Sequence, residues 1–298
     1  MQINGLHLLL TYQCTFECDH CFVWGSPFQQ GTMTLSDVRR ILHPAKDLKT
    51  VEWIYFEGGE PTLYYPILLR SVRLAHDMGF QVGIVSNAYW AEGLEDALEW
   101  LRPFAGLVDD FSVSSDLYHY SEQISQQSRL AAAAAAQLGI PLGTLSIAQP
   151  EQSEASSVQG KLPPGESSIM YRGRAAVKLS DRIIHQPWSN FQECPYEDLI
   201  DPGRLHVDPL GYLHMCQGIT IGNMFTDPLY KLLETYEPAA HPIVGPLIAG
   251  GPVELAYRYE VPHQDAYADA CHLCYETRRA LRTRFPEILA PDQVYGVF

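Results

Sequence analysis

The sequence predicts an α/β protein, an open, partial (β/α)6 TIM-like barrel followed by a small C-terminal domain of one β-hairpin and one helix. Strand-like apolar runs alternate with helix-like stretches over roughly the first 170 residues, which is typical of parallel βα units. The strand-like runs number six, too few for a complete eight-stranded barrel. Because the alternation stops near residue 180, we expect a barrel core over 1–175 and a second domain over 176–298.

The core elements follow in order. Strands are expected at 5–12, 51–56, 80–85, 107–113 and 140–148, with a short sixth at 168–171. Helices are expected from 35 towards 44 and at 64–78, 91–103 and 121–138. Thr34 and Asp37 have the spacing of a capping box at the start of the first helix, and Pro44 is expected to disturb or end it. Residues 149–168, rich in Gln, Ser, Glu, Pro and Gly, are predicted to be a loop.

The C-terminal part has a different pattern. Residues 204–216 predict a hairpin around the turn Asp208-Pro209-Leu210-Gly211. A helix is expected at about 226–236, a Pro- and Gly-rich passage at 238–252, and a last helix beginning near Cys271. The last helix is expected to carry a basic face near its carboxyl end, where helix polarity favours cations; that face comprises Arg278, Arg279, Arg282 and Arg284.

Charge and hydropathy exclude several classes of partner. The net charge of −15 argues against binding to nucleic acid or an anionic membrane, because Lys and Arg drive phosphate binding. No stretch approaches the roughly 18 apolar residues of a membrane span. Residues 1–12 lack the basic region and cleavage site of a signal peptide. We expect a cytoplasmic protein with reduced cysteines.

Three cysteines are grouped near the start of the chain, at Cys14, Cys18 and Cys21, directly after an apolar strand. Thiolates hold iron–sulfur clusters, and a complete cubane normally takes four of them. A group of three suggests a cluster with one iron open to another ligand. Strand ends of this kind are where parallel α/β folds bind ligands. The alternatives are a zinc site, which prefers four closed ligands, or three unrelated core cysteines.

The pattern C-x3-C-x2-C followed by an aromatic, Phe22, resembles the signature of the radical S-adenosylmethionine (SAM) superfamily. The resemblance implies a 4Fe-4S cluster on the three cysteines, with SAM chelating the open iron and Phe22 beside the cofactor. It further implies reductive cleavage of SAM to a 5′-deoxyadenosyl radical, which abstracts a substrate hydrogen. An external one-electron reductant such as flavodoxin or ferredoxin is then expected.

Gly58-Gly59-Glu60-Pro61, after the second strand, resembles the GGEP motif of the same family. Paired glycines allow close approach of backbone to a ligand. The resemblance implies that backbone carbonyls of this loop bind the SAM amino group and that Glu60 holds the loop or the ammonium. Taken alone, such a sequence is an ordinary turn.

Polar residues end two later strands, at Ser86-Asn87 and Ser114-Ser115-Asp116. Family members place contacts to the SAM ribose and carboxylate there, and small polar groups suit that role; helix or turn capping is an equal alternative. Arg172 and Arg174 are candidates for pairing with a carboxylate, or are a surface pair. His119 and Arg172 are the candidate catalytic bases.

Four cysteines remain, at Cys194, Cys216, Cys271 and Cys274. Their spacing resembles the Twitch appendage, a shortened SPASM domain of radical SAM enzymes, in which a hairpin and a helix carry one auxiliary 4Fe-4S cluster. Complete ligation by four cysteines would suit electron transfer. The alternative is a zinc ribbon on the same thiolates.

The two resemblances together predict an oxidoreductase-type radical SAM enzyme that carries out a net oxidation, a dehydrogenation of a small molecule. The first alternative is a maturase that oxidises, crosslinks or rearranges residues of a ribosomally made peptide. The second, from another class, is a non-enzymatic iron–sulfur electron carrier, which would need no SAM-type loop and no barrel.

Overall fold

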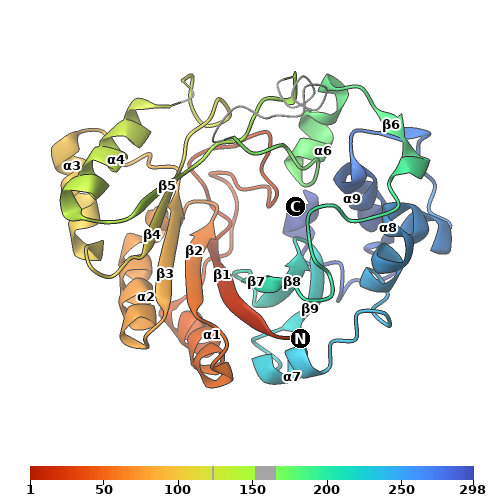
Figure 1. The fold of residues 1–298 in the computed structure, drawn as a ribbon, viewed down its shortest axis with the longest axis horizontal. Helices are drawn as coiled ribbons and strands as arrows, with labels where there is room; N and C mark the ends of the chain where they lie inside the picture. The colour runs from red at the N-terminus through yellow and green to blue at the C-terminus, as the bar shows by residue number, and fades with distance from the viewer. Residues whose placement is uncertain (123, 152–165) are drawn as a thin grey trace.

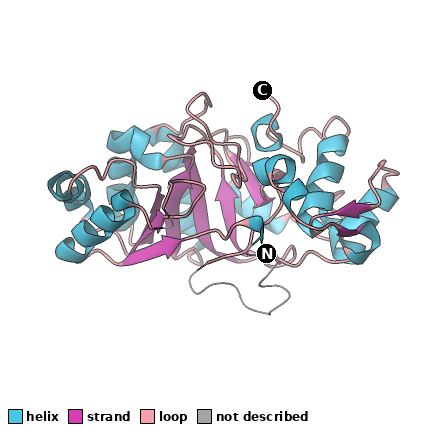
Figure 2. Cartoon of the chain, turned by 90° about the horizontal axis from the view of Figure 1, so that it is seen from above, coloured by secondary structure: helices cyan, strands magenta, loops and turns pink. Residues whose placement is uncertain are grey.

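The computed structural model describes residues 1–122, 124–151 and 166–298. An eight-stranded sheet with strand order β5-β4-β3-β2-β1-β7-β8-β9 forms the centre of the fold. Helices α1 to α4 lie along the outer side of β1 to β5, and α8 and α9 lie at the opposite end (Figure 1). Seen from above, the strands occupy the middle, with helices on both flanks (Figure 2).

The strands of this sheet are β1 (Ile3–Thr11), β2 (Trp53–Gly58), β3 (Gln81–Ser86), β4 (Asp110–Ser114), β5 (Leu142–Leu145), β7 (Gly203–Val207), β8 (Tyr212–Cys216) and β9 (Ile219–Asn223). β6 (Gln186–Pro187) and β10 (Ala266–Tyr267) form a separate antiparallel pair. The helices are α1 (Leu35–Leu48), α2 (Tyr65–Asp77), α3 (Leu94–Leu101), α4 (Gln126–Leu138), α6 (Arg174–Lys178), α7 (Leu229–Glu234), α8 (Val244–Arg258) and α9 (Ala270–Leu281).

β1 to β5 pair in parallel with their neighbours, so their carboxyl ends meet at one edge. β1 is the most deeply buried of them. Leu6, Leu8 and Leu10 are fully buried in the same apolar core as Val38 and Ile41 of α1. Each such side chain contributes about 1.5–3 kcal/mol relative to exposure. The predicted α/β class with a mostly parallel sheet is confirmed, and the capping box of Thr34 and Asp37 is present at the start of α1.

The sixth parallel strand is not the predicted one. Residues 168–171 form no strand; the preceding Ser167 makes only an isolated bridge to Ile147, two residues beyond the end of β5. Instead β7 pairs in parallel with β1, on the side away from β2. The predicted hairpin (β7 and β8) therefore lies in the same sheet as the core strands, while the boundary after residue 175 stays a prediction. Of the predicted loop at 149–168, residues 152–165 lie outside the described residues.

Two segments that contain proline are helical, and the predicted interruption at Pro44 is wrong. α1 continues through Pro44 to Leu48, because apolar positions on both sides of the proline, including Ile41 and Ala45, are buried in the core. Residues 244–258, most of which fall in the Pro- and Gly-rich passage at 238–252, form α8, which bends at Gly250 and Gly251. Buried apolar residues on both sides of this bend keep the two halves helical. Among the described helices, none has the length and apolar character needed to cross a membrane.

Candidate active site

A cavity of about 270 Å³ lies at the carboxyl ends of β2 to β5. It brings together almost every residue predicted for the SAM site. The lining includes Cys14, Cys18, Cys21, Phe22, Gly58, Gly59, Glu60, Ser86, Asn87, Ser114, Asp116, His119 and Arg172. Pro61 is the exception, since it does not line the cavity and begins a short 3-10 helix.

A buried arginine braces the loop that carries the three cysteines. Arg174 donates to the carbonyl oxygens of Cys18 (2.8 Å) and Gly25 (2.7 Å), and its backbone N–H donates to the carbonyl of Cys21 (2.9 Å). The preceding Gly173 has φ +61°, and a Cβ there would overlap the carbonyl oxygen of Cys21. Arg174 is therefore neither a carboxylate partner nor a surface residue, as the sequence had suggested, but the support of the cysteine loop.

The cysteine side chains have an environment that suits metal binding. Burial raises the pKa of Cys14 to about 12 and raises the pKa of Cys18 further. A buried thiolate therefore needs a cation beside it, and a coordinated metal supplies that charge. The backbone N–H of Gly25 donates to the Cys21 sulfur at 3.2 Å, the type of contact that tunes iron–sulfur clusters. These donors fit an iron–sulfur cluster at the mouth of the cavity.

Glu60 holds the loop after β2. It has no exposed surface, and its carboxylate accepts from the backbone N–H groups of Thr62 (3.1 Å) and Asn87 (2.8 Å). The hydroxyl groups of Thr62 (2.5 Å) and Ser86 (2.9 Å) also donate to it. The glycines serve close packing as well, because a Cβ on Gly59 would overlap the carbonyl oxygen of Gln13.

Ser86 and Asn87 differ in what they contribute. The Ser86 hydroxyl donates to Glu60 and accepts from Ala88 N (3.0 Å) and Trp90 Nε1 (3.1 Å), which is the capping alternative. The Asn87 amide instead reaches the cysteine loop, donating to Thr15 Oγ1 at 3.0 Å. Asn87 thus joins the end of β3 to the cysteine loop.

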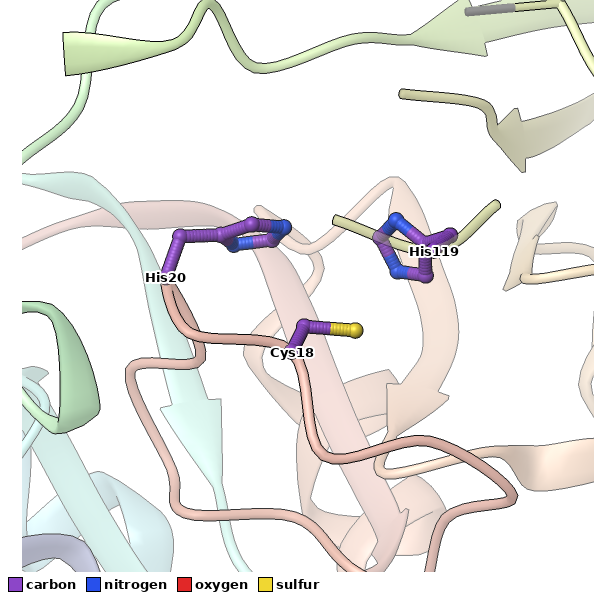
Figure 3. Close-up of side chains that lie close together, drawn as sticks. All are labelled: Cys18, His20 and His119. Carbon is purple, nitrogen blue, oxygen red and sulfur yellow. The ribbon is translucent and has the colours of Figure 1, made fainter. Parts of the chain in front are cut away.

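Asp116 orients His119 at the cavity wall. Its carboxylate lies 2.7 Å from His119 Nδ1 and 3.7 Å from His20 Nε2. Figure 3 shows Cys18 and His20 projecting from one loop towards His119, which comes from a separate segment. Burial raises the pKa of Asp116, but the contact with His119 outweighs it and keeps the pKa below its usual range. An ionised Asp116 accepts a hydrogen bond from the Nδ1–H group of His119, which leaves His119 Nε2 as the atom that can accept a proton.

Glu57, which precedes the GGEP motif, also lines the cavity and was missed by the sequence analysis. It lies beside two histidines, His7 of β1 and His206 of β7. Burial raises the pKa of Glu57, but His206 and His7 outweigh it and hold the pKa well below its usual range. Burial lowers the pKa of His206. An acidic residue directly before a motif at a strand end is the signal that would have found it.

A second, smaller cavity of about 20 Å³ is lined by all four remaining cysteines, Cys194, Cys216, Cys271 and Cys274. Arg278 lies there too, almost fully buried, and donates to the carbonyl of Gln217 at 2.8 Å. Arg278, one of the four residues of the predicted basic face, is therefore buried. Burial lowers the pKa of Arg278, but Tyr295 and then the thiols of Cys274, Cys216 and Cys271 outweigh burial and raise it.

Arg172 lines both cavities. Its Nη1 donates to the Cys216 sulfur (3.1 Å) and to Glu197 Oε1 (3.4 Å), and its guanidinium lies 5.6 Å from the ring centroid of Phe22. Burial opposes its charge, but Cys216, Cys271 and Glu197 outweigh burial and raise the pKa of Arg172. Arg172 therefore stays protonated and cannot serve as a base, which leaves His119 as the candidate.

The spacing of the four sulfurs at the second cavity can be compared with that of a zinc site. Among the described residues, three or more potential ligand atoms lie within 4.8 Å of one another in two groups, Cys18-His20-His119 and His7-Glu57-His206. The four C-terminal cysteines form no such group. Tetrahedral zinc with bonds of about 2.3 Å would bring its sulfur ligands to about 3.8 Å from one another. The four sulfurs are therefore not gathered at the spacing of a zinc site, and the cavity of about 20 Å³ that they line has room for about one water-sized group.

Comparison with known proteins assigns the N-terminal part of the chain to a family. Residues 8–141 match the model of the Radical SAM superfamily. The S-adenosylmethionine-dependent nucleotide dehydratase of Fibrobacter sp. (strain UWH6) is 25% identical over 121 residues, covering 39% of this chain and 34% of that protein. The chain spans about a third of the length of the curated relatives that it matches.

Two solved structures share the fold. BtrN in complex with AdoMet and 2-DOIA has a TM-score of 0.52 at 14% identity, covering 78% of this chain and 82% of BtrN. Native anSMEcpe with bound AdoMet and Cp18Cys peptide has a TM-score of 0.52 at 12% identity, covering 95% and 97% of the two chains. At such identities the likeness concerns the fold. The family match, with its three cysteines at the edge of a parallel sheet, identifies residues 8–141 as a radical SAM domain.

Proposed function

We propose that this protein is a radical SAM enzyme that abstracts a hydrogen atom from a small molecule and completes a net oxidation. The observation that carries the proposal is the shared cavity: the three cysteines, the GGEP loop and the polar strand ends all line one space of about 270 Å³. A non-enzymatic electron carrier would need a cluster but no cavity beside it. The expected external reductant is a flavodoxin or ferredoxin, and the expected location is the cytoplasm.

In this proposal Cys14, Cys18 and Cys21 hold a 4Fe-4S cluster with SAM at its open iron. The bound cluster and SAM supply the one-electron cleavage that generates the radical. The chain's own residues hold the site in place: Arg174 fixes the cysteine loop, and Glu60 fixes the loop after β2. His119, oriented by Asp116 at 2.7 Å, is placed to accept the proton that a net oxidation releases.

The four C-terminal cysteines would hold an auxiliary 4Fe-4S cluster that takes up the electron left on the substrate. Arg172 supports this assignment because it lines both cavities and donates to Cys216. Together with Arg278 it places two permanent positive charges beside the thiolates, which stabilises an anionic cluster. Four cysteines complete the ligation, so no iron is left open for substrate.

A small molecule is the first candidate substrate. The cysteine layout resembles that of Twitch radical SAM enzymes, which include dehydrogenases of aminocyclitol alcohols. The peptide maturase is the alternative. Measuring which compounds raise the rate of SAM cleavage separates the two: aminocyclitol alcohols should stimulate it and short peptides should not.

Cys274→Ala separates the roles of the two clusters. Anaerobically reconstituted protein is expected to hold about eight irons, and the variant about four, with SAM cleavage retained. Circular dichroism first establishes that the variant is folded, because metal binding and folding are coupled in such modules. If the unaltered protein holds about four irons plus one zinc, the four C-terminal cysteines form a zinc ribbon and the auxiliary-cluster assignment is wrong.

A further inference from the structure

We propose that His7, Glu57 and His206 form a binding site for one divalent transition-metal ion of the zinc type, separate from both cysteine groups. The three residues lie on three adjacent strands, β1, β2 and β7. The site does not depend on the radical function proposed above, because its ligands include no cysteine.

Strand register brings the three side chains to one face of the sheet. His7 pairs with His206 across β1 and β7, and Leu9 pairs with Glu57 across β1 and β2. Because side chains alternate along a strand, His7 and Leu9 point to the same face. Glu57 and His206 therefore project on that face as well, on either side of His7.

The distances are those of a metal site. Glu57 Oε1 lies 3.4 Å from His7 Nδ1 and 3.2 Å from His206 Nε2, and the three ligand atoms lie within 4.8 Å of one another. Zinc bonds to histidine nitrogen and carboxylate oxygen measure about 2.1 Å. A tetrahedral ion with such bonds spaces its ligand atoms about 3.4 Å apart, so the two measured distances already fit.

The same atoms lack other partners. Within the described part of the chain, His7 Nδ1 and Glu57 Oε1 are buried and have no hydrogen-bond partner. Buried polar atoms without a partner are rare in native proteins and point to a missing water or ion. Here both histidine nitrogens approach one carboxylate oxygen, at 3.2 and 3.4 Å. A cation bound between the three atoms satisfies all of them at once.

Neighbouring side chains hold the first histidine in place. The His7 ring stacks on Tyr55, with centroids 4.6 Å apart and 15° between the planes. The Tyr55 hydroxyl donates to Asp110 Oδ2 at 2.9 Å, and the Trp53 ring stacks on the Tyr55 ring, with centroids 5.5 Å apart. Fixed orientation of a ligating histidine is a regular feature of metal sites.

The arrangement leaves a coordination position open. Three protein ligands of the His2Glu type complete only part of a tetrahedron, as in catalytic zinc sites. Glu57 lines the larger cavity, which also contains Cys14, Cys18 and Cys21. An ion held by Glu57 therefore lies at the edge of that cavity. The ligand class for the open position is a water molecule or a substrate hydroxyl, carboxylate or amine group, which such an ion binds and orients.

Zinc uptake by the reconstituted, full-length protein tests the proposal. After incubation with one equivalent of Zn²⁺ and desalting, elemental analysis should give about one zinc per chain. Zinc-edge X-ray absorption reports the zinc ligands independently of iron. It should show nitrogen and oxygen neighbours at about 2.0–2.1 Å and no sulfur at about 2.3 Å.

Substitutions locate the site. His206→Ala and the isosteric Glu57→Gln should each weaken zinc binding at least tenfold, while the exposed His76→Ala should bind as the unaltered protein does. Iron content and circular dichroism establish that each variant is folded. If His206→Ala is not folded, the zinc affinity of Glu57→Gln decides the test. No zinc uptake, sulfur ligation of the zinc, or equal binding by folded Glu57→Gln would each overturn the proposal. SAM cleavage is assayed separately, so these outcomes leave the proposed function untouched.

Discussion

Glu60→Ala should destabilise the folded protein as well as disturb a ligand contact. The Glu60 carboxylate is fully buried and accepts four hydrogen bonds, two of them from the backbone N–H groups of Thr62 and Asn87. In the alanine variant these two donors lose their partner in a place that water does not reach. Each unpaired buried donor costs about 1–3 kcal/mol. The expected loss in the free energy of unfolding is therefore about 2–6 kcal/mol.

Glu60→Gln gives a graded comparison. The side-chain oxygen of the glutamine can keep the three hydrogen bonds that Oε1 of Glu60 accepts. Its amide group, however, replaces Oε2, which in the unaltered protein accepts a hydrogen bond from the backbone N–H of Asn87. One lost acceptor predicts a smaller cost of about 1–3 kcal/mol. Urea unfolding of the cluster-free proteins, followed by circular dichroism, measures both values. The exposed Glu92→Ala should stay within about 0.5 kcal/mol of the unaltered protein. If Glu60→Ala is no less stable than this control, the structural role assigned to Glu60 is refuted.

Three further predictions follow from buried polar groups. Arg174→Gln removes the donors that hold the cysteine loop and should lower the amount of iron held by Cys14, Cys18 and Cys21, whereas the exposed Arg284→Gln should not. Equal iron contents in the two variants would contradict the bracing role of Arg174. Tyr12→Phe deletes a buried hydroxyl 2.7 Å from Asp208 and should cost about 1.5–3 kcal/mol in thermal unfolding; an unchanged melting temperature would contradict this. Burial lowers the pKa of His241 in the folded protein, so the unfolded chain binds the proton more readily. The free energy of unfolding should therefore fall as the pH drops below about 6.5. His241→Gln should remove that part of the pH dependence.

Local patterns in the sequence, together with the family resemblance, indicated which residues gather at the larger cavity. Strand-like runs end at the cysteine loop, at Gly58 and at Ser86, and parallel strands bring such ends to one edge of a sheet. The capping box that starts α1 was equally visible, because its two residues are neighbours in the chain. Each of these signals lies within a few residues of the feature that it predicts.

Features that depend on distant contacts were not predictable in this way. β7 takes the sixth parallel position because its backbone pairs with β1, about 200 residues earlier. Arg278 is buried beside the four C-terminal cysteines and donates to the carbonyl oxygen of Gln217, which lies 61 residues earlier in the chain. Its sequence neighbours show only that it belongs to a basic stretch of α9. The His7-Glu57-His206 group likewise comes from three strands that are far apart in sequence.

SAM cleavage by the reduced protein tests the central claim most directly. The anaerobically reconstituted protein, with a one-electron reductant and SAM, is predicted to release 5′-deoxyadenosine. The variant with Cys14, Cys18 and Cys21 all replaced by Ala should hold about four irons and release none. Release of 5′-deoxyadenosine by that variant, or none from unaltered protein that holds about eight irons, would contradict the assignment of the three-cysteine cavity as the site of SAM cleavage.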